Sequence, residues 1–256
     1  MAEILLVGDP EILQDWRTLL QGHNLSTLSL DQMSEMVSHS FHRNGGTYPE
    51  KPPIPDFVFE CFGTLEDKLA AADYLPEFMN DDTVVVTNVI PATATEVAEW
   101  FDDYPRVIGA CALPSLLLLT PRIELCRGPH TVDVAATLVQ ELLKDAGKGV
   151  EWVEDRVGLI APRVLAMIIN EAAFAVMEGV AEPADIDRAM RLGTNYPKGP
   201  LEWGDEIGLD YVVLTLEALF EEYHDDRYRP CVLLKQMVRA GKLGKREGAG
   251  FYEYVL

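Results

Sequence analysis

The chain has 256 residues, of which 48% are hydrophobic, enough for one or two globular domains with a proper core and too many for a disordered protein. Its 42 acidic and 21 basic residues give a formal net charge of −21, which repels phosphate backbones and anionic lipids, so neither nucleic acid nor a membrane is an expected partner. The four cysteines lie far apart with no CxxC pair, which argues against disulfides and against a zinc site.

The first part of the chain alternates β-rich segments with helix-forming ones. Strands are predicted at 4–7, 25–30, 57–59, 84–87, 107–110 and 123–126. Helices are predicted at 65–72, 94–101 and 132–144, where apolar residues recur three and four positions apart. The segment 39–55 is crowded with Gly and Pro and has no apolar period, which predicts a surface loop. This alternation is typical of a doubly wound parallel sheet.

From residue 154 onward the pattern is helical. A broad apolar stripe over 164–177 predicts a helix that is buried on two sides. The segments 183–193 and 230–241, each with Pro near its start and Gly at its end, predict two more helices. We therefore predict an α/β domain over residues 1–153 and an all-α domain over residues 154–256.

Other features of the second half predict packing rather than chemistry. YPKGPLEWGD (196–205) predicts a bend between helices, and GAGFY (248–252) predicts close docking of the chain end. The one dense basic cluster is expected to be a solvated tail: Arg239, Lys242, Lys245 and Arg246.

The sequence offers no targeting or membrane segment. The start MAEILLVGD has no basic residues ahead of a long apolar run, and the longest apolar stretch, around 112–119, is too short to span a bilayer. With the cysteines expected to be reduced, we predict a cytoplasmic protein.

Three stretches of the second half carry a family pattern: GLIAPRVLAMIINEA (158–172), EGVAEPADIDRAMRLGTNYPKGPLEWGDEIGLD (178–210) and MVRAGKLGKREGAGFYEY (237–254). They resemble the C-terminal domain of 3-hydroxyacyl-CoA dehydrogenases. Weaker similarity in PDFVFECFGTLEDK (55–68), TVVVTN (83–88) and RVIGACALP (106–114) extends the resemblance over the whole chain. It implies a Rossmann-like domain that binds NAD, a helical domain of the 6-phosphogluconate-dehydrogenase type that completes an acyl-CoA thioester site, and a homodimer formed through the helical domain.

A dinucleotide fingerprint needs glycines at a tight turn, beside the pyrophosphate and at the helix–strand contact. In VGDPEILQDW (7–16), Gly8 matches the first glycine, whereas Pro10 and Leu13 occupy the other two places. Pro10 lacks a backbone N–H, and Asp9 and Glu11 place carboxylates at the helix N-terminus where phosphate would lie. The sequence therefore disfavours the binding of NAD.

Two further residues are candidates for cofactor contacts. Asp31 ends the second predicted strand, where an acid would receive the ribose hydroxyls, although counting from Gly22 and His23 places Ser29 there instead. A role as a turn residue is the alternative for Asp31. Asn88, the last residue of TVVVTN, is the second candidate.

Relatives use a His general base oriented by a Glu, with a Ser and an Asn that hydrogen-bond the substrate oxygen. In GACALP (109–114) the resemblance places Cys111 at the His position, and a thiol is a poor proton acceptor at pH 7. The Ser position falls at Ile90 or Pro91 and the Asn position at Pro162, and none of these side chains donates a hydrogen bond. Glu124 best matches the orienting carboxylate.

Glu124 needs compensation if no imidazole lies beside it. A buried carboxylate is costly unless it is paired or protonated, so we expect Arg122, Arg163 or a shared proton next to it. His130 lies near Glu124 in the sequence, but its GPHT loop predicts a surface position.

These substitutions predict a 3-hydroxyacyl-CoA dehydrogenase-like protein of fatty-acid and acyl-CoA metabolism with impaired or lost NAD-dependent activity. Two alternatives stay open: an active NAD-linked oxidoreductase with relocated catalytic residues, and a non-catalytic dimer that binds acyl-CoA or a protein. New chemistry built on Cys111 and Glu124 is disfavoured, because a neighbouring carboxylate raises the pKa of a thiol.

Overall fold

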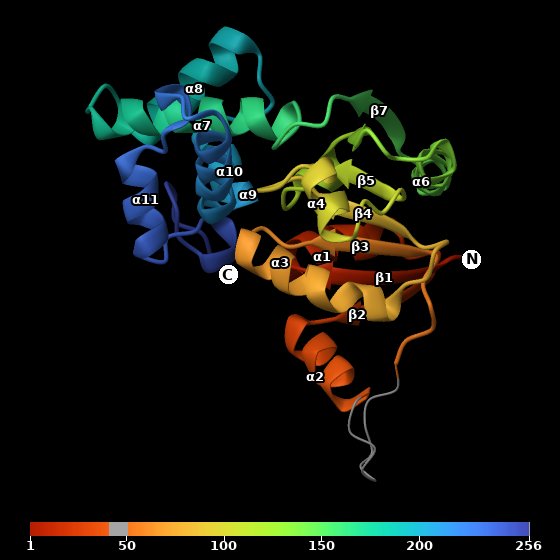
Figure 1. The fold of residues 1–256 in the computed structure, drawn as a ribbon. Helices are drawn as coiled ribbons and strands as arrows, with labels where there is room; N and C mark the ends of the chain where they lie inside the picture. The colour runs from red at the N-terminus through yellow and green to blue at the C-terminus, as the bar shows by residue number, and fades with distance from the viewer. Residues whose placement is uncertain (41–50, 256) are drawn as a thin grey trace. The chain divides into compact units, whose positions relative to one another are not determined.

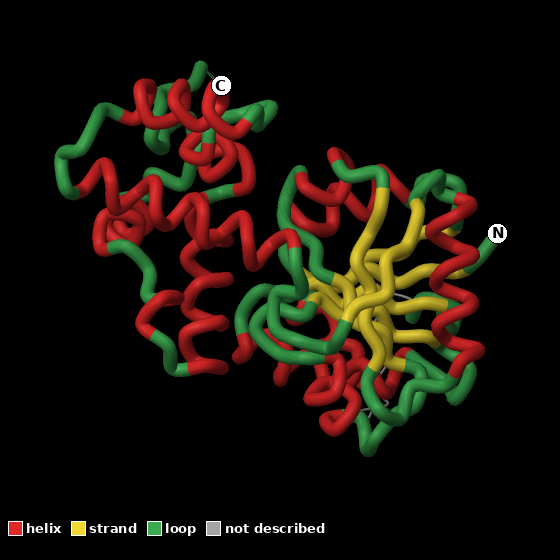
Figure 2. Tube along the Cα trace, turned by 90° about the horizontal axis from the view of Figure 1, so that it is seen from above, coloured by secondary structure: helices red, strands yellow, loops and turns green. Residues whose placement is uncertain are grey.

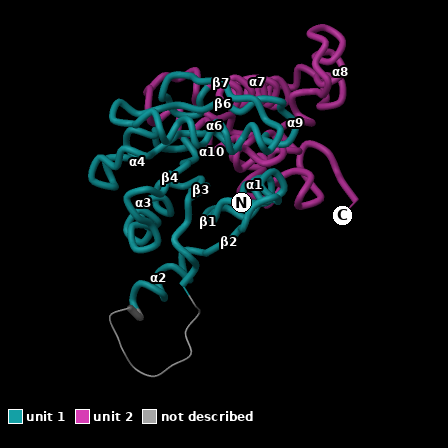
Figure 3. Tube along the Cα trace, turned by 90° about the vertical axis from the view of Figure 1, so that its right-hand side faces the viewer, with its two compact units in different colours: residues 1–112, 117–159 teal, residues 113–116, 160–256 magenta. Residues whose placement is uncertain are grey.

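The structure, a computed structural model, describes residues 1–40 and 51–255, which form two compact units. The first unit comprises residues 1–112 and 117–159, and the second comprises residues 113–116 and 160–256 (Figure 3). The predicted division after residue 153 stays a proposal.

The first unit is built on one seven-stranded sheet with the strand order β2-β1-β3-β4-β5-β6-β7 (Figure 1). Its strands are β1 (Glu3–Gly8), β2 (Asn24–Leu28), β3 (Phe57–Cys61), β4 (Val84–Asn88), β5 (Val107–Ala110), β6 (Arg122–Arg127) and β7 (Gly149–Val153). The first five strands are parallel to one another. β6 pairs antiparallel with β5 and parallel with β7. The predicted Rossmann-like sheet is thus present, with a reversed edge.

Helices flank this sheet (Figure 2). They are α1 (Pro10–Leu19), α2 (Leu30–Ser40), α3 (Leu65–Tyr74), α4 (Ala94–Trp100), α5 (Leu116–Leu119) and α6 (Asp133–Asp145), with a 3₁₀ turn η1 at Leu75–Phe78. Every residue of β3, β4 and β5 is buried, because helices cover both faces of a parallel sheet. On one face the Trp16 ring of α1 lies 4.5 Å from the ring of Phe59, whereas Val58 joins a cluster that includes α3 and α4 residues.

The sequence located six of the seven strands but did not predict β7, α2 or the short helix α5. β7 was not predicted, because GVEWV is half-exposed at the sheet edge and has no clean alternation. α2 was not predicted either. β2 ends at Leu28, and α2 takes up residue 30 of the expected strand and the first two residues of the expected loop at 39–55. Residues 41–50 of that loop lie outside the described residues.

The second unit is helical, as predicted. Its helices are α7 (Ala161–Met177), α8 (Pro183–Thr194), α9 (Pro200–Ile207), α10 (Leu209–Tyr223) and α11 (Val232–Arg239), with 3₁₀ turns η2 at Asp226–Tyr228 and η3 at Lys245–Glu247. The bend predicted over 196–205 is confined to residues 196–199, because α9 begins at Pro200 and the LEWGD segment is helical. Across residues 1–40 and 51–255, every helix is too short or too polar to cross a bilayer.

Two buried carboxylates hold the second unit together. Asp187 accepts hydrogen bonds from the N–H groups of Leu201 and Glu202, both at 2.9 Å, and so caps the start of α9. Asp205 accepts hydrogen bonds from the N–H groups of Phe251 and Tyr252, both at 2.9 Å. The expected close docking of the chain end is therefore a hydrogen-bonded contact with α9.

The predicted basic tail is partly wrong. Arg246 forms an ion pair with Asp210 on α10, and its guanidinium lies 5.3 Å from the centroid of the Tyr211 ring. Its side chain is only 26% exposed, because it packs against the unit instead of extending into solvent. Arg239, Lys242 and Lys245 are exposed, as expected.

Candidate active site

Gly8 ends β1 where the strand order of the sheet changes direction, with β2 on one side of β1 and β3 on the other. In open α/β sheets, ligands bind outside the carboxyl ends of the strands at such a switch point. Gly8 has a φ of +140°, and a Cβ atom there would lie 2.5 Å from the backbone carbonyl carbon of Cys61. Only glycine fits, so this position keeps the tight turn of a dinucleotide fingerprint.

The helix that follows Gly8 fits a dinucleotide poorly. α1 begins at Pro10, with Asp9 at its N-cap and Glu11 in its first turn. Proline suits this helix position, but it removes one of the N–H groups that would otherwise face a phosphate. The Asp9 charge reaches the β3 end, where it raises the pKa of the Cys61 thiol after the larger effects of burial and Glu60. The third fingerprint glycine is also absent, since Leu13 is buried at that place with 4% exposure.

The structure corrects the placement of Asp31. β2 ends at Leu28, and Asp31 is an exposed residue in the first turn of α2. Ser29, the alternative position, lies directly after the strand, where its hydroxyl accepts a hydrogen bond from the Gln32 N–H at 3.2 Å and its own N–H donates to the Gln32 side chain at 2.9 Å. This reciprocal cap starts α2 and explains why the chain leaves the strand early. The cofactor role of Asp31 stays a prediction.

A buried polar network lies at the carboxyl ends of β3 and β4. The Lys68 ammonium of α3 forms an ion pair with Glu60 and donates to the Thr87 hydroxyl at 3.0 Å. Thr87 donates to Glu60 at 2.5 Å, and the Phe62 N–H donates to the other Glu60 oxygen at 2.9 Å. Glu60, Lys68 and Thr87 are at most 2% exposed. A buried pair with every oxygen bonded is tolerated in a core, whereas either charge alone would be costly.

Asn88 closes the end of β4 against the segment after β5. It is 3% exposed, and its side-chain oxygen accepts a hydrogen bond from the Ala112 N–H at 3.1 Å. This contact holds the backbone directly after Cys111. Asn88 therefore has a positioning role in the fold, and contact with a cofactor stays a prediction.

Cys111 and Glu124 lie close together, at the end of β5 and near the start of antiparallel β6. The pairing of Ala110 with Leu125 brings the two residues to the same edge of the sheet. Burial raises the pKa of the Cys111 thiol well above its ordinary value, and the Glu124 charge raises it further, while the Lys68 ammonium lowers it slightly. A thiol in this setting stays protonated at neutral pH and accepts no proton from a substrate.

Arg122, one expected partner of Glu124, has other contacts, whereas the expected pairing of Glu124 with Arg163 stays a prediction. Arg122 pairs with Glu151 on β7 and donates to the Val150 carbonyl at 2.8 Å. Arg163 belongs to α7 of the second unit, where it donates to the Tyr223 hydroxyl at 2.8 Å. Glu124 is half-buried, so water supplies part of its solvation.

The remaining predicted positions are apolar or exposed. Ile90 is fully buried and Pro91 is half-buried in the first unit. Pro162 is a buried first-turn residue of α7 in the second unit. His130 is exposed, as its loop predicted. Within residues 1–40 and 51–255, no group of three or more His, Cys, Asp or Glu side chains is arranged to hold a metal ion.

Sequence reasoning missed the network of Glu60, Lys68 and Thr87. The available signal was a charged residue inside the apolar strand FVFEC, since a fully buried strand tolerates a carboxylate only with a partner. The sequence did not identify Lys68 as the partner of Glu60. Lys68 lies eight residues further along, on a helix whose other charged residues predict a solvated face.

Comparison with known proteins agrees with this fold. The sequence pattern that defines the 3-hydroxyacyl-CoA dehydrogenase C-terminal domain matches residues 158–254. A Bacillus subtilis protein described as a probable 3-hydroxybutyryl-CoA dehydrogenase is 40% identical over 206 residues, covering 80% of this chain and 71% of that protein. The chain belongs to the 3-hydroxyacyl-CoA dehydrogenase family. Its relatives support a function like that of a 3-hydroxyacyl-CoA dehydrogenase.

Other family members support the same relationship. The 3-hydroxybutyryl-CoA dehydrogenase of Clostridioides difficile is 37% identical over 202 residues, covering 78% of this chain and 71% of that protein. The crystal structure of (S)-3-hydroxybutyryl-CoA dehydrogenase from Ralstonia eutropha is 27% identical with a TM-score of 0.75 and covers 99% of both chains. A Mycobacterium tuberculosis structure at 24% identity, with a TM-score of 0.79, shares the fold.

Proposed function

We propose that this chain is a 3-hydroxyacyl-CoA dehydrogenase-like protein of acyl-CoA metabolism in which NAD-dependent turnover is strongly reduced. The proposal rests on Cys111, which the family resemblance places at the position of the general base. Its thiol is kept protonated by burial and by Glu124. Loss of a general base typically costs about 10²- to 10⁴-fold in rate. The positions that the resemblance assigns to oxygen binding, Ile90 or Pro91 and Pro162, are apolar as well, and their loss overlaps with this effect rather than multiplying it.

The nucleotide site supports the same proposal. Pro10 removes a phosphate-facing N–H, and Asp9 and Glu11 oppose an anion at the start of α1. The overall charge of −21 adds to the repulsion of both NAD and acyl-CoA. The family relationship favours an acyl-CoA thioester as the ligand. Because the phosphates are repelled, we expect the apolar acyl chain to supply most of the binding energy.

Purified protein is expected to bind NADH weakly and to reduce acetoacetyl-CoA at least about 10²-fold more slowly than a family member with an intact base. The measurements are a calorimetric titration with NADH and the loss of NADH absorbance on adding acetoacetyl-CoA. The Clostridioides difficile relative is a suitable positive control. Tight NADH binding with comparable turnover would instead support the alternative of an active enzyme with a relocated base. The 37 to 40% identity to proteins described as dehydrogenases is the reason for that alternative.

We also propose that the chain forms a homodimer through its second unit. α7 carries a hollow of about 350 Å³ that includes Val164, Met167 and Ile168, and Val164 is 50% exposed. Exposed apolar hollows of this kind are typical of surfaces that another chain covers. Sedimentation is expected to give a mass near twice 28.5 kDa, and Val164→Glu to shift it to the monomer. Leu192→Glu, at an 80% exposed site on α8, is the matched control, and a monomeric wild-type protein would refute the proposal.

A further inference from the structure

A second cavity lies in the first unit at the opposite edge of the sheet from Gly8, Asn88 and Cys111. It is formed where the chain enters β4, after η1, and where it enters β5, after α4. Its volume is about 230 Å³. Aromatic and sulfur-containing side chains line it together with two carboxylates: Met79, Trp100, Phe101, Tyr104, Asp81 and Asp102.

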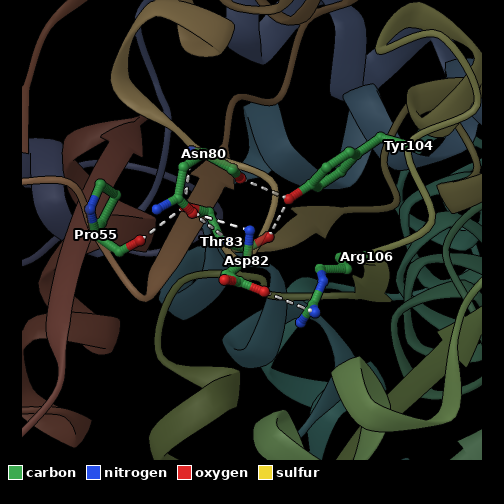
Figure 4. A network of polar contacts seen from close by, with 6 residues as sticks. All are labelled: Pro55, Asn80, Asp82, Thr83, Tyr104 and Arg106. Atoms are coloured by element: carbon green, nitrogen blue, oxygen red, sulfur yellow. Dashed lines mark hydrogen bonds and ion pairs between the residues drawn. The ribbon is translucent and has the colours of Figure 1, made fainter.

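The Tyr104 ring is held in place by its own hydroxyl group (Figure 4). The single hydroxyl proton is shared between the carbonyl oxygens of Asn80 at 3.0 Å and of Thr83 at 2.5 Å. Thr83 in turn donates its hydroxyl proton to the Pro55 carbonyl at 2.8 Å. These bonds tie the turn before β4 to the segment before β5. The Tyr104 hydroxyl is thus engaged within the fold, and the ring contributes an apolar wall to the cavity.

The charged side chains that line the cavity are carboxylates. Asp81 and Asp102 line it and are exposed. Arg106, drawn beside Tyr104 in Figure 4, forms an ion pair at 3.1 Å with Asp82, a carboxylate outside the lining, which compensates its charge. Burial is the main cause that raises the pKa of Tyr104; the Arg106 guanidinium lowers it, and the carboxylates of Asp81 and Asp82 raise it by smaller amounts.

We propose that this cavity binds a small organic ammonium cation. Aromatic ring faces attract cations through their quadrupole, most strongly when the ring is Trp, and carboxylates at the rim supply the complementary charge. A volume of about 230 Å³ suits a group as small as a quaternary ammonium head. The site stands apart from the family's carboxyl-edge site, and the net charge of −21 favours a cationic ligand.

The test is a titration of the full-length protein with choline and, separately, with 3,3-dimethyl-1-butanol, its neutral isostere, at constant sodium chloride concentration. Choline is expected to bind with a millimolar dissociation constant, and the neutral isostere about tenfold more weakly, since the charge supplies the difference. Equal binding of the two probes, or no choline binding at tens of millimolar, would overturn the proposal. A trimethyllysine peptide that binds about tenfold more tightly than choline would also overturn it, because the site would then be a peptide site.

Variants locate the site. Asp102→Asn combined with Asp81→Asn is expected to weaken choline binding about tenfold, as is Trp100→Leu. Asp102 has a φ of 55°, a left-handed conformation that asparagine tolerates, so this change preserves the backbone. Asp103→Asn is the matched control, since Asp103 has a φ of 58° but does not line the cavity. If Asp103→Asn weakens binding as much as the double variant, the effect is only long-range charge. Circular dichroism verifies that each variant is folded.

Discussion

Replacing Lys68 with methionine is expected to lower the free energy of unfolding by about 3–5 kcal/mol, the usual cost of removing one partner of a buried ion pair. Methionine fills much of the same volume, so the loss comes from charge and not from a cavity. Glu60 would keep its bonds from Thr87 and from the Phe62 N–H but would lose the ammonium that neutralises it. Because the pair is at most 3% exposed by side chain, water cannot replace that partner.

Urea denaturation measures this change, and hydrogen exchange of the β3 and β4 amides locates it in the first unit. Lys235→Met is the matched control, because its ion pair with Glu217 is exposed and is expected to be worth less than about 1 kcal/mol. The double variant Glu60→Gln with Lys68→Met is expected to recover about half of the loss or more, since neither charge remains buried. A double variant as unstable as Lys68→Met alone would show that packing, and not charge, dominates.

Short segments of the sequence predicted most strands of the first unit, because each apolar run by itself indicates a strand that must be buried. The apolar runs of β3, β4 and β5 need burial on both faces, which a parallel sheet between helix layers provides. The elements that were missed depend on other signals. α2 starts through the reciprocal bonds of Ser29 and Gln32, and β7 is held by pairing with β6 rather than by its own composition.

The sequence predicted the candidate site only at positions where the type of a single residue determines the local structure. Gly8 is required by the close approach of Cys61, and Pro10 occupies the first position of α1, where proline is favoured. The neighbourhood of Cys111 could be inferred only through the family resemblance. β6 pairs antiparallel with β5 and so brings Glu124 close to Cys111. The periodicity of the sequence does not show whether a strand runs parallel or antiparallel to its neighbour.

The same neighbourhood predicts that a base can be restored. In a Pro10→Gly background, which returns an N–H to the start of α1, Cys111→His is expected to raise acetoacetyl-CoA reduction by NADH about 10²-fold or more. An imidazole with an ordinary pKa near 6.5 exchanges protons at neutral pH, whereas the Cys111 thiol, with its pKa raised by burial and Glu124, does not. The Glu124 carboxylate would fix the tautomer of the new imidazole and stabilise its protonated form.

Steady-state rates at millimolar NADH measure this gain, with Cys111→Ser in the same background as the matched control. Serine has nearly the volume of cysteine but brings no base, so its rate is expected to stay at the Pro10→Gly level. Adding Glu124→Gln to the histidine variant is expected to remove most of the gain, because an amide cannot stabilise an imidazolium as a carboxylate does. A gain that survives Glu124→Gln unchanged would show that Glu124 does not orient the base. A serine variant as active as the histidine variant would show that Cys111 does not occupy the position of the base, and the proposed cause of the reduced turnover would then be wrong.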